Sequence, residues 1–368
     1  MAIPELKLMI PGPVELEADV LEALGKPVLP HYGPEWTQLY NETTSMLGQI
    51  FQTEGNIFIL VGSGSSAIDA CIGSALATGE QIIVGVNGFF GERVAHIARS
   101  YGLEVIPVEA EFGQPLKTSW FEDALRRHPS AKAVAAVHLE TSTTVVNPVP
   151  EIGQAARRHG VPYIVDAVST IGGLPFEMDE WGIDFCAAAS QKCLGGPPGL
   201  APVAVGPRGW EAVDRIPTHN HGWYLNLSTW REHALKWADF HPFPVTMATN
   251  NVVALNRSLH NLLAVGLEKR LAAYRELALH LRANLRLIGF EPYTPDEQMA
   301  PVLTAAYGPK GVDTRKIVSF VAENYGIRIS SGFGEQLVDK IIRIGHMSPT
   351  VTKEDIDRLI EALHAFAE

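Results

Sequence analysis

Cysteine is scarce in this sequence, and long apolar runs are absent. The 368 residues contain three cysteines, Cys71, Cys186 and Cys193, and none belongs to a Cys-x-x-Cys pair. Such scattered cysteines indicate reduced thiols in a cytosolic protein and give no sign of a disulfide framework. No run of about eighteen apolar residues occurs, so we expect no membrane span. Residues 1–5 show no charged segment leading into an apolar one, so we expect no secretion signal.

Positive charge is also low. The 29 Lys and Arg residues are outnumbered by 41 Asp and Glu residues, which leaves a formal net charge of −12. This balance argues against a nucleic-acid-binding surface and favours a soluble cytoplasmic enzyme. The length suits a large domain and a smaller one. No internal repeat or low-complexity segment is present.

Apolar strands alternate with amphipathic helices through the first half of the chain. Continuous apolar strands of this kind predict a mainly parallel, seven-stranded sheet with helices on both faces, an α/β fold. Ligands of such sheets bind beyond the carboxyl ends of the strands. The predicted strands are Ile57–Val61, Gln81–Val86, Glu104–Val108, Ala133–Val137, Tyr163–Val165, Phe185–Ala189 and Pro202–Val205.

The second half predicts a small α+β domain after a long helix. Residues Thr218–Phe243 are rich in Trp and His and are interpreted as irregular, and Asn250–Leu287 as one helical run. His219 and His221 have no Asp, Glu or Cys at ligand spacing, so no metal site is predicted. We expect an N-terminal arm over 1–14, a large domain over 15–262 and a small domain over 263–368.

Lys192 stands between an apolar run, Ile183–Ala189, and a Gly/Pro-rich turn. A lysine at the rim of a buried strand suits a functional amine held in a fixed place, although a lysine in a surface loop is the ordinary alternative. Asp166 similarly ends the apolar run Tyr163–Val165. A carboxylate there requires a cationic partner, unless it serves as a structural cap.

Residues 62–67 form a glycine-rich turn between a strand and a helix. Backbone N–H groups at such a helix start attract a phosphate. Gly62, Gly64 and Ala67 also fit the dinucleotide pattern, but that reading needs an acid after the next strand. That strand ends in Val86-Asn87-Gly88, so a single phosphate is favoured and a nicotinamide-dependent dehydrogenase is opposed.

Further candidate site residues follow other predicted strands. Phe90 is placed either to stack on a flat ring or to join the core, and residues 138–143 offer hydroxyl groups. Arg343 ends a late apolar strand, where it either binds a carboxylate or forms a structural ion pair. A phosphate cradle, a stacking aromatic, a buried carboxylate and a lysine together are what pyridoxal phosphate requires.

At these positions the sequence resembles the class V branch of the fold type I pyridoxal-phosphate enzymes, and most of all the alanine/serine–glyoxylate aminotransferase family. The likeness covers essentially the whole chain. The motifs that carry it are Pro11-Gly12-Pro13, Gly62-Ser63-Gly64-Ser65, Asn87-Gly88-Phe89-Phe90-Gly91, His138-Leu139-Glu140-Thr141-Ser142-Thr143, Val165-Asp166-Ala167-Val168-Ser169, Ser190-Gln191-Lys192 and Arg343-Ile344-Gly345.

The resemblance implies a role for each matching residue. Lys192 is the lysine that forms the Schiff base and moves the proton, and Asp166 pairs with the pyridine nitrogen. Phe90 stacks on the ring, and Arg343 binds the substrate carboxylate. The remaining implied cofactor contacts are the phosphate ligands Ser63, Gly64, Ser65 and Gln191, then Ser142 near the ring hydroxyl, and Thr246 reaching the phosphate of the partner subunit in a homodimer. His31 and Phe243 are candidates for the substrate pocket.

The resemblance also implies a ping-pong aminotransferase that uses a small donor, such as alanine or serine, and glyoxylate or pyruvate. Two relatives are the alternatives. Pyridoxamine–pyruvate aminotransferase carries a second Arg where this chain has Phe333 and an acid where it has Ser63. Ureidoglycine–glyoxylate aminotransferase uses Gln where His31 stands and Asn near Phe243. A cysteine desulfurase needs a loop cysteine in the C-terminal half, which is missing, and a non-catalytic binding module would not need both Lys192 and Arg343.

Overall fold

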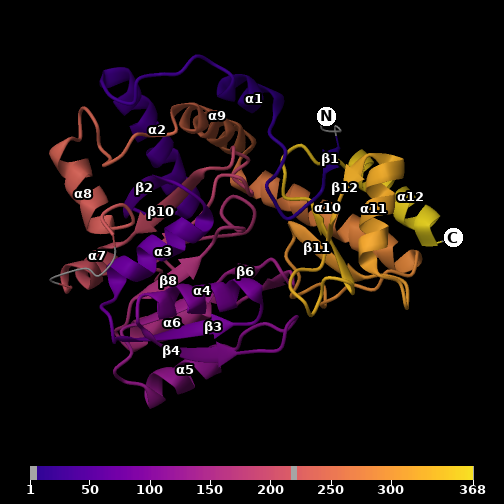
Figure 1. Ribbon diagram of the computed structural model, residues 1–368, viewed down its shortest axis with the longest axis horizontal. Coiled ribbons are helices and arrows are strands. Elements are labelled where there is room, and N and C mark those ends of the chain that lie inside the picture. Colours follow the sequence, from indigo (N-terminus) through magenta and orange to yellow (C-terminus); the bar gives the residue numbers. More distant parts are fainter. Residues whose placement is uncertain (1–5, 217–221, 368) are drawn as a thin grey trace.

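The computed structural model describes residues 6–216 and 222–367, and its centre is a seven-stranded sheet (Figure 1). The strand order is β2-β10-β9-β8-β5-β3-β4, and β10 alone runs antiparallel to its neighbours. The mainly parallel sheet predicted from the sequence is therefore confirmed. Its strands are β2 (Asn56–Val61), β3 (Gln81–Val86), β4 (Glu104–Glu109), β5 (Ala133–Val137), β8 (Tyr163–Asp166), β9 (Phe185–Ala187) and β10 (Leu200–Val205).

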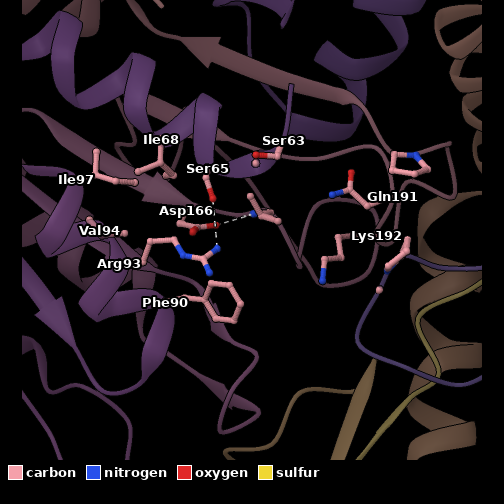
Figure 2. A pocket seen from close by; sticks show the side chains of 15 residues that line it. Ser63, Ser65, Ile68, Phe90, Arg93, Val94, Ile97, Asp166, Gln191 and Lys192 are labelled. Atoms are coloured by element: carbon pink, nitrogen blue, oxygen red, sulfur yellow. Dashed lines mark hydrogen bonds between the residues drawn. The ribbon is translucent and has the colours of Figure 1, made fainter. Parts of the chain in front are cut away.

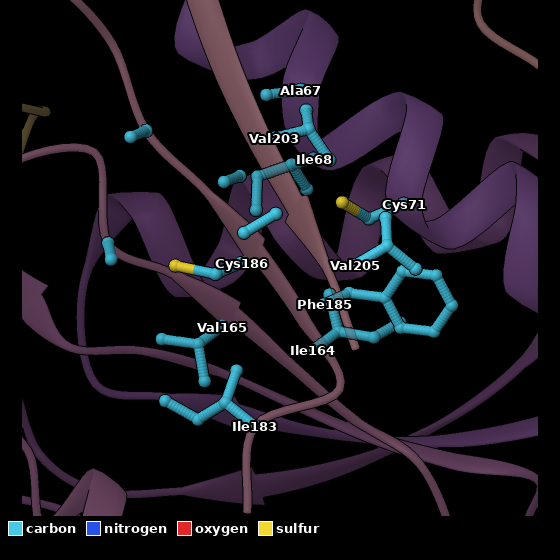
Figure 3. Packing of buried hydrophobic residues seen from close by; sticks show 14 of the residues in the cluster. Ala67, Ile68, Cys71, Ile164, Val165, Ile183, Phe185, Cys186, Val203 and Val205 are labelled. Carbon is cyan, nitrogen blue, oxygen red and sulfur yellow. The ribbon is translucent and has the colours of Figure 1, made fainter. Parts of the chain in front are cut away.

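Helices cover both faces of this sheet, which explains why its central strands are apolar throughout. Every residue of β5, β9 and β10 is buried. Figure 3 shows Ile68 and Cys71 of α3 packed against strand residues such as Val203. The helices of this part are α1 (Ala18–Leu24), α2 (Pro34–Phe51), α3 (Gly64–Ala75), α4 (Phe89–Ser100), α5 (Thr118–Arg127), α6 (Val149–Arg158), α7 (Pro207–Asp214), α8 (Leu227–Lys236) and α9 (Thr249–Val265).

Helix α8 corrects the expectation that Thr218–Phe243 is irregular. The helix begins after Asn226, whose side chain accepts a hydrogen bond from Ser228 N at 2.9 Å. Its residue Trp230 is fully buried. An Asn cap followed by a buried aromatic is enough to start a helix, and the many Trp and His residues obscured that signal. His219 and His221 lie outside the described residues. Within the described residues, no group of three or more His, Cys, Asp or Glu side chains could hold a metal ion.

The prediction of one helical run over Asn250–Leu287 is wrong about its continuity. It is two helices, α9 and α10 (Leu267–Leu287), because the chain turns at Gly266. Gly266 has a φ of 85°, which lies outside the helical region. Glycine adopts this backbone conformation without the steric strain that a Cβ would cause. Apolar residues at helical spacing continue on both sides of it, so the periodicity alone did not reveal the break.

The C-terminal unit, residues 267–367, is the predicted α+β structure. Its sheet has the order β11-β14-β13, with β11 (Leu303–Tyr307), β13 (Ser330–Ser331) and β14 (Ile341–Gly345) antiparallel. Helices α10, α11 (Thr314–Tyr325) and α12 (Lys353–Ala367) pack on it. The boundaries proposed at 14 and 262 stay predictions.

The N-terminal arm connects the two parts. Strand β1 (Lys7–Leu8) pairs with β12 (Ile327–Arg328) of the C-terminal unit (Figure 1). The arm then crosses to the large sheet, where Val14 N donates to Gln191 O at 3.1 Å. The arm therefore passes directly beside Lys192.

Two predictions from composition can be compared with the structure. None of the helices in residues 6–216 and 222–367 is long and apolar enough to cross a bilayer. Cys71, Cys186 and Cys193 are free and buried, which agrees with the expected thiols. Cys193 packs inside the protein, with its Sγ 3.5 Å from Ser169 O. The cytoplasmic location stays a prediction.

Candidate functional site

A cavity of about 260 Å³ opens beyond the carboxyl ends of the parallel strands (Figure 2). The turn after β2, the first turn of α4, the end of β8 and the segment after β9 all contribute to its wall. Seven residues predicted from the sequence line this one cavity: Ser63, Gly64, Ser65, Phe90, Asp166, Gln191 and Lys192.

Lys192 is held at the side of the cavity by the N-terminal arm. Its Nζ donates a hydrogen bond to the carbonyl oxygen of Pro11. The pKa of Lys192 is lowered to about 8, mainly by burial and with a smaller contribution from Arg343, against the opposite effect of Cys193. A lowered pKa leaves more of the amine unprotonated near neutral pH, and the unprotonated amine is the form that attacks a carbonyl carbon.

Gly12 allows the arm to pass this close to the lysine. A Cβ at position 12 would lie 2.7 Å from Lys192 Cδ, and the residue has a φ of +102°. Both the space and the backbone conformation therefore favour glycine.

We expect Gly12→Ala to displace Lys192 as well as to destabilise the protein. Gly79→Ala is the matched control, because Gly79 has a φ of +86° but a Cβ there would meet no other residue within 4 Å. Both changes should cost about 1–3 kcal/mol of folding free energy, measured by denaturant unfolding. Only Gly12→Ala should also change the titration of Lys192 and the binding of a carbonyl ligand to it. Equal behaviour of the two variants would contradict a role for Gly12 in placing the lysine.

Asp166 lies at the back of the cavity, as the last residue of β8. Its Oδ1 accepts a hydrogen bond from Val168 N at 3.0 Å. Burial raises the pKa of Asp166 to about 6, partly offset by that hydrogen bond and by Arg93 and Lys192. Among the described residues it forms no salt bridge. A desolvated carboxylate of this kind favours a cationic ligand.

The turn after β2 provides an anion-binding end. Helix α3 begins at Gly64, and no side chain caps its first N–H groups. Ser63 and Ser65 line the cavity at this helix start, where the helix dipole favours negative charge. Gln191 faces the same space, and its buried Oε1 has no hydrogen-bond partner in the described part of the chain.

Arg93 is a cavity residue that sequence reasoning missed. It lies in α4 and reaches into the cavity, where its Nη1 is 3.3 Å from Ser65 Oγ (Figure 2). Its guanidinium carbon is 4.8 Å from the ring centre of Phe90. Helix α4 starts at Phe89. With the observed start, the spacing of three residues places Phe90 and Arg93 on one face, and that spacing was the available signal.

A second cavity, of about 420 Å³, adjoins the first and shares Gly12, Phe90 and Lys192 with it. Arg343, on β14, lies in its wall beside Phe333, with 5.4 Å between the guanidinium carbon and the ring centre. Arg343 Nε donates to Ser331 O at 3.0 Å and Nη1 to Thr141 O at 2.9 Å. Burial lowers its pKa to about 10. Within the described residues no carboxylate forms a salt bridge with Arg343, so the ion-pair alternative has no partner there.

Four predicted residues lie outside both cavities. Ser142 is fully buried, and its hydroxyl donates to Glu140 and accepts from Phe89 N. Phe243 is also fully buried, with its ring centre 5.0 Å from that of Tyr40. His31 Nδ1 lies 3.1 Å from His241 Nε2. Thr246 is exposed. This chain by itself brings none of the four to Lys192.

A family model and several known proteins match this chain over most of its length. The family model described as aminotransferase class-V matches residues 21–359. An aminotransferase of Methanocaldococcus jannaschii is 34% identical, over 94% of this chain and 89% of that protein. A protein described as the small subunit of a soluble hydrogenase of Synechococcus is 35% identical, over 97% and 92%. The (S)-ureidoglycine–glyoxylate transaminase of Bacillus subtilis is 31% identical, over 99% and 91%.

Solved structures resemble the chain over its whole length. Alanine–glyoxylate aminotransferase from Nostoc superimposes with a TM-score of 0.95 at 29% identity, over 100% of this chain and 97% of that one. Ureidoglycine–glyoxylate aminotransferase from Bacillus subtilis gives 0.94 at 31%, over 99% and 93%. Pyridoxamine–pyruvate aminotransferase from Mesorhizobium loti gives 0.92 at 28%, over 100% and 92%.

Proposed function

Because the chain belongs to the class V aminotransferase family, we propose that it transfers the amino group of a small amino acid, such as alanine or serine, to glyoxylate or pyruvate, with pyridoxal 5′-phosphate as cofactor. One observation carries this proposal. Lys192, Asp166 and the start of α3 line a single cavity, and Arg343 lies in the adjoining one.

The residues of the first cavity fit this cofactor. Figure 2 shows Ser63, Phe90, Asp166 and Lys192 around one open space. Gln191 can offer its Nε2 donor to a phosphate, and Asp166, which has no salt-bridge partner among the described residues, suits a protonated ring nitrogen. The uncapped start of α3 suits a phosphate. Phe90 offers an aromatic face against which a flat ring stacks.

Each residue then has a chemical task. When bound, pyridoxal phosphate supplies an aldehyde carbon for the amine and a ring that accepts electrons from the substrate Cα. Lys192 would hold the cofactor through its amine and, as the free amine, would move the proton that leaves the substrate Cα. Asp166 keeps the ring nitrogen protonated. Ser63, Ser65 and Gln191 orient the phosphate.

Arg343 is proposed to bind the substrate carboxylate. Two of its N–H groups are taken by the carbonyl oxygens of Ser331 and Thr141, and these fix the plane of the guanidinium. Arg343 lines a cavity that Lys192 also lines, and its remaining N–H groups are proposed to face the substrate there. A planar donor pair of this kind suits a carboxylate. Phe333 and Val318 line the same cavity, which favours a small substrate side chain.

We expect Arg343→Gln to raise the KM for the amino donor and for the oxo acid about 100-fold, with a smaller loss in kcat and unchanged cofactor binding. Arg282→Gln is the control, because Arg282 is also a buried arginine held by carbonyl oxygens, those of Ala300 and Leu303, away from both cavities. The control should lose stability while keeping its KM. Steady-state kinetics on both variants decide the matter, and an unchanged KM in Arg343→Gln would contradict the assignment.

The proposal is tested directly by a half-reaction screen. The purified protein should gain a visible absorbance band when pyridoxal phosphate is added, and an accepted donor should remove that band. Alanine, serine, glycine, ureidoglycine and pyridoxamine, tried singly, separate the main proposal from its two alternatives, which are the activities of two structural relatives. Glyoxylate or pyruvate should then restore the band. A protein that never binds the cofactor would overturn the proposal.

The chain is further proposed to act as a homodimer with active sites at the interface. Two loop segments expose apolar side chains next to each other: Val28 is 77% and Tyr32 is 52% exposed, and the Tyr32 ring lies 5.6 Å from that of Phe240. Thr246 is exposed and the His31 ring lies 5.7 Å from that of Tyr32, so a second copy is the means by which these two would approach a cofactor, whereas Phe243 is buried within its own chain. Light scattering at working concentrations should give twice the mass of the 40.0 kDa chain.

A further inference from the structure

Glu140 is a fully buried carboxylate that the proposed reaction does not use. It ends strand β6 (Leu139–Glu140), which forms a hairpin with β7 (Val145–Val146). Its Oε2 accepts hydrogen bonds from Phe90 N and Gly91 N, each at 3.0 Å. Its Oε1 accepts from the backbone N and the hydroxyl of Ser142. Four donors thus converge on one carboxylate.

The first pair of these bonds holds the start of α4. The residue before this helix, Gly88, has no side chain to cap it, and a Cβ there would lie 2.3 Å from Glu140 Cγ. Glu140 therefore occupies the place of a capping side chain and presents negative charge to the positive end of the helix. The first turn that it holds carries Phe90, and Arg93 follows three residues later in the same helix; both line the first cavity.

The other side of Glu140 leads to the second cavity. The adjacent residue, Thr141, accepts the hydrogen bond from Arg343 through its carbonyl oxygen. The turn is closed on Glu140 itself, because Thr143 N and Thr144 N both donate to Glu140 O, at 3.2 Å and 2.7 Å. The carbonyl that orients Arg343 is thus one residue from the carboxylate that orients Phe90.

We propose that Glu140 is a positioning residue that links the two cavities. It holds Phe90, the ring-stacking residue, and Arg343, the carboxylate-binding residue, at a fixed distance and orientation to each other. Ser142 belongs to the same unit, since its hydroxyl links Glu140 to Phe89 N. This inference rests on the proposed function, because it assumes that Phe90 faces the cofactor and Arg343 the substrate.

The charges around Glu140 are compatible with this role. Burial raises the pKa of Glu140, and Asp166 adds to that effect, whereas the hydrogen bonds from Ser142 and Gly91 oppose it. Arg343 is near enough for Glu140 to favour its charged form. A glutamine at position 140 keeps the size but has one acceptor oxygen, and its NH₂ group would face two N–H or O–H donors.

The test is Glu140→Gln beside Asp184→Asn in the cofactor-loaded protein. Asp184 is also a buried carboxylate that accepts from a backbone N–H, that of Tyr163 at 2.8 Å, but it lies at the opposite end of the sheet. Glu140→Gln should raise both the dissociation constant of pyridoxal phosphate and the KM of the amino donor about tenfold, with less change in kcat. Asp184→Asn should lower the Tm while leaving both constants unchanged.

A second variant covers the case in which Glu140→Gln does not fold. Ser142→Ala removes one link of the unit, and it should raise the same two constants together by about threefold. If the variants lose only Tm, like Asp184→Asn, the coupling role is overturned. If Ser142→Ala weakens only cofactor binding, Ser142 contacts the cofactor directly and the coupling role is overturned as well. Wild-type protein that binds no pyridoxal phosphate would refute the proposed function itself, independently of these variants.

Discussion

Lys192→Ala is expected to abolish the visible absorbance of the cofactor-loaded protein and to lower the transamination rate by at least about 10³-fold. Two tasks are lost together, since the amine both holds the aldehyde carbon and carries the proton. Cofactor absorbance and single-turnover rates measure the two losses separately. The cavity itself should survive, because the neighbouring segment is held by backbone hydrogen bonds such as that from Val14 N to Gln191 O.

Lys192→Arg is the matched control for charge. Arginine keeps the cation near Asp166 but stays protonated at working pH, so it cannot hold the aldehyde carbon. We therefore expect the same loss of absorbance, with tighter residual binding of pyridoxal phosphate than in Lys192→Ala. An alanine variant that keeps the visible band would show that another amine serves as the cofactor lysine.

Asp166→Asn is expected to have the second largest effect. An amide cannot keep the ring nitrogen protonated, so the ring no longer withdraws electrons from the substrate Cα. The loss of one charge-assisted hydrogen bond alone is worth about 1.5–3 kcal/mol, or roughly 10- to 150-fold in rate, and we expect at least that decrease in kcat. Asp184→Asn, at the far end of the same strands, should keep its kcat. Comparable kcat in Asp166→Asn and wild type would contradict the assignment.

The same variant has a consequence for stability without cofactor. Burial raises the pKa of Asp166 from 3.8 to about 6. The folded protein then binds this proton more tightly than the unfolded chain does, so its stability falls as the pH rises from 3.8 through about 6. Asp166→Asn carries no titrating group there, and its free energy of unfolding should lack this decrease. Denaturant unfolding at a series of pH values, without cofactor, compares the two slopes.

The sequence by itself determined the fold class and the residues at the strand ends. Apolar strands alternating with helices leave few ways to form a parallel sheet, and the carboxyl ends of its strands meet at one edge. Ser63, Phe90, Asp166 and Lys192 each follow a strand that the local pattern reveals. Their meeting in one cavity therefore required no knowledge of long-range packing. Arg343 was found from a charge next to an apolar run, but the expectation that it ends its strand was wrong, because it lies in the middle of β14.

Only the tertiary structure decided what lies between these residues. Lys192 meets Pro11 across 181 positions, and Phe90 meets Glu140 across 50. Such contacts depend on which helix turn faces which loop, and Arg93 was missed because the local pattern does not show which helix residues face the cavity. Ser142 was assigned to the cofactor ring by the family resemblance alone, and in the structure its hydroxyl donates to Glu140. Local patterns specify elements and their ends, whereas the direction of a buried side chain is set by the partners that folding brings to it.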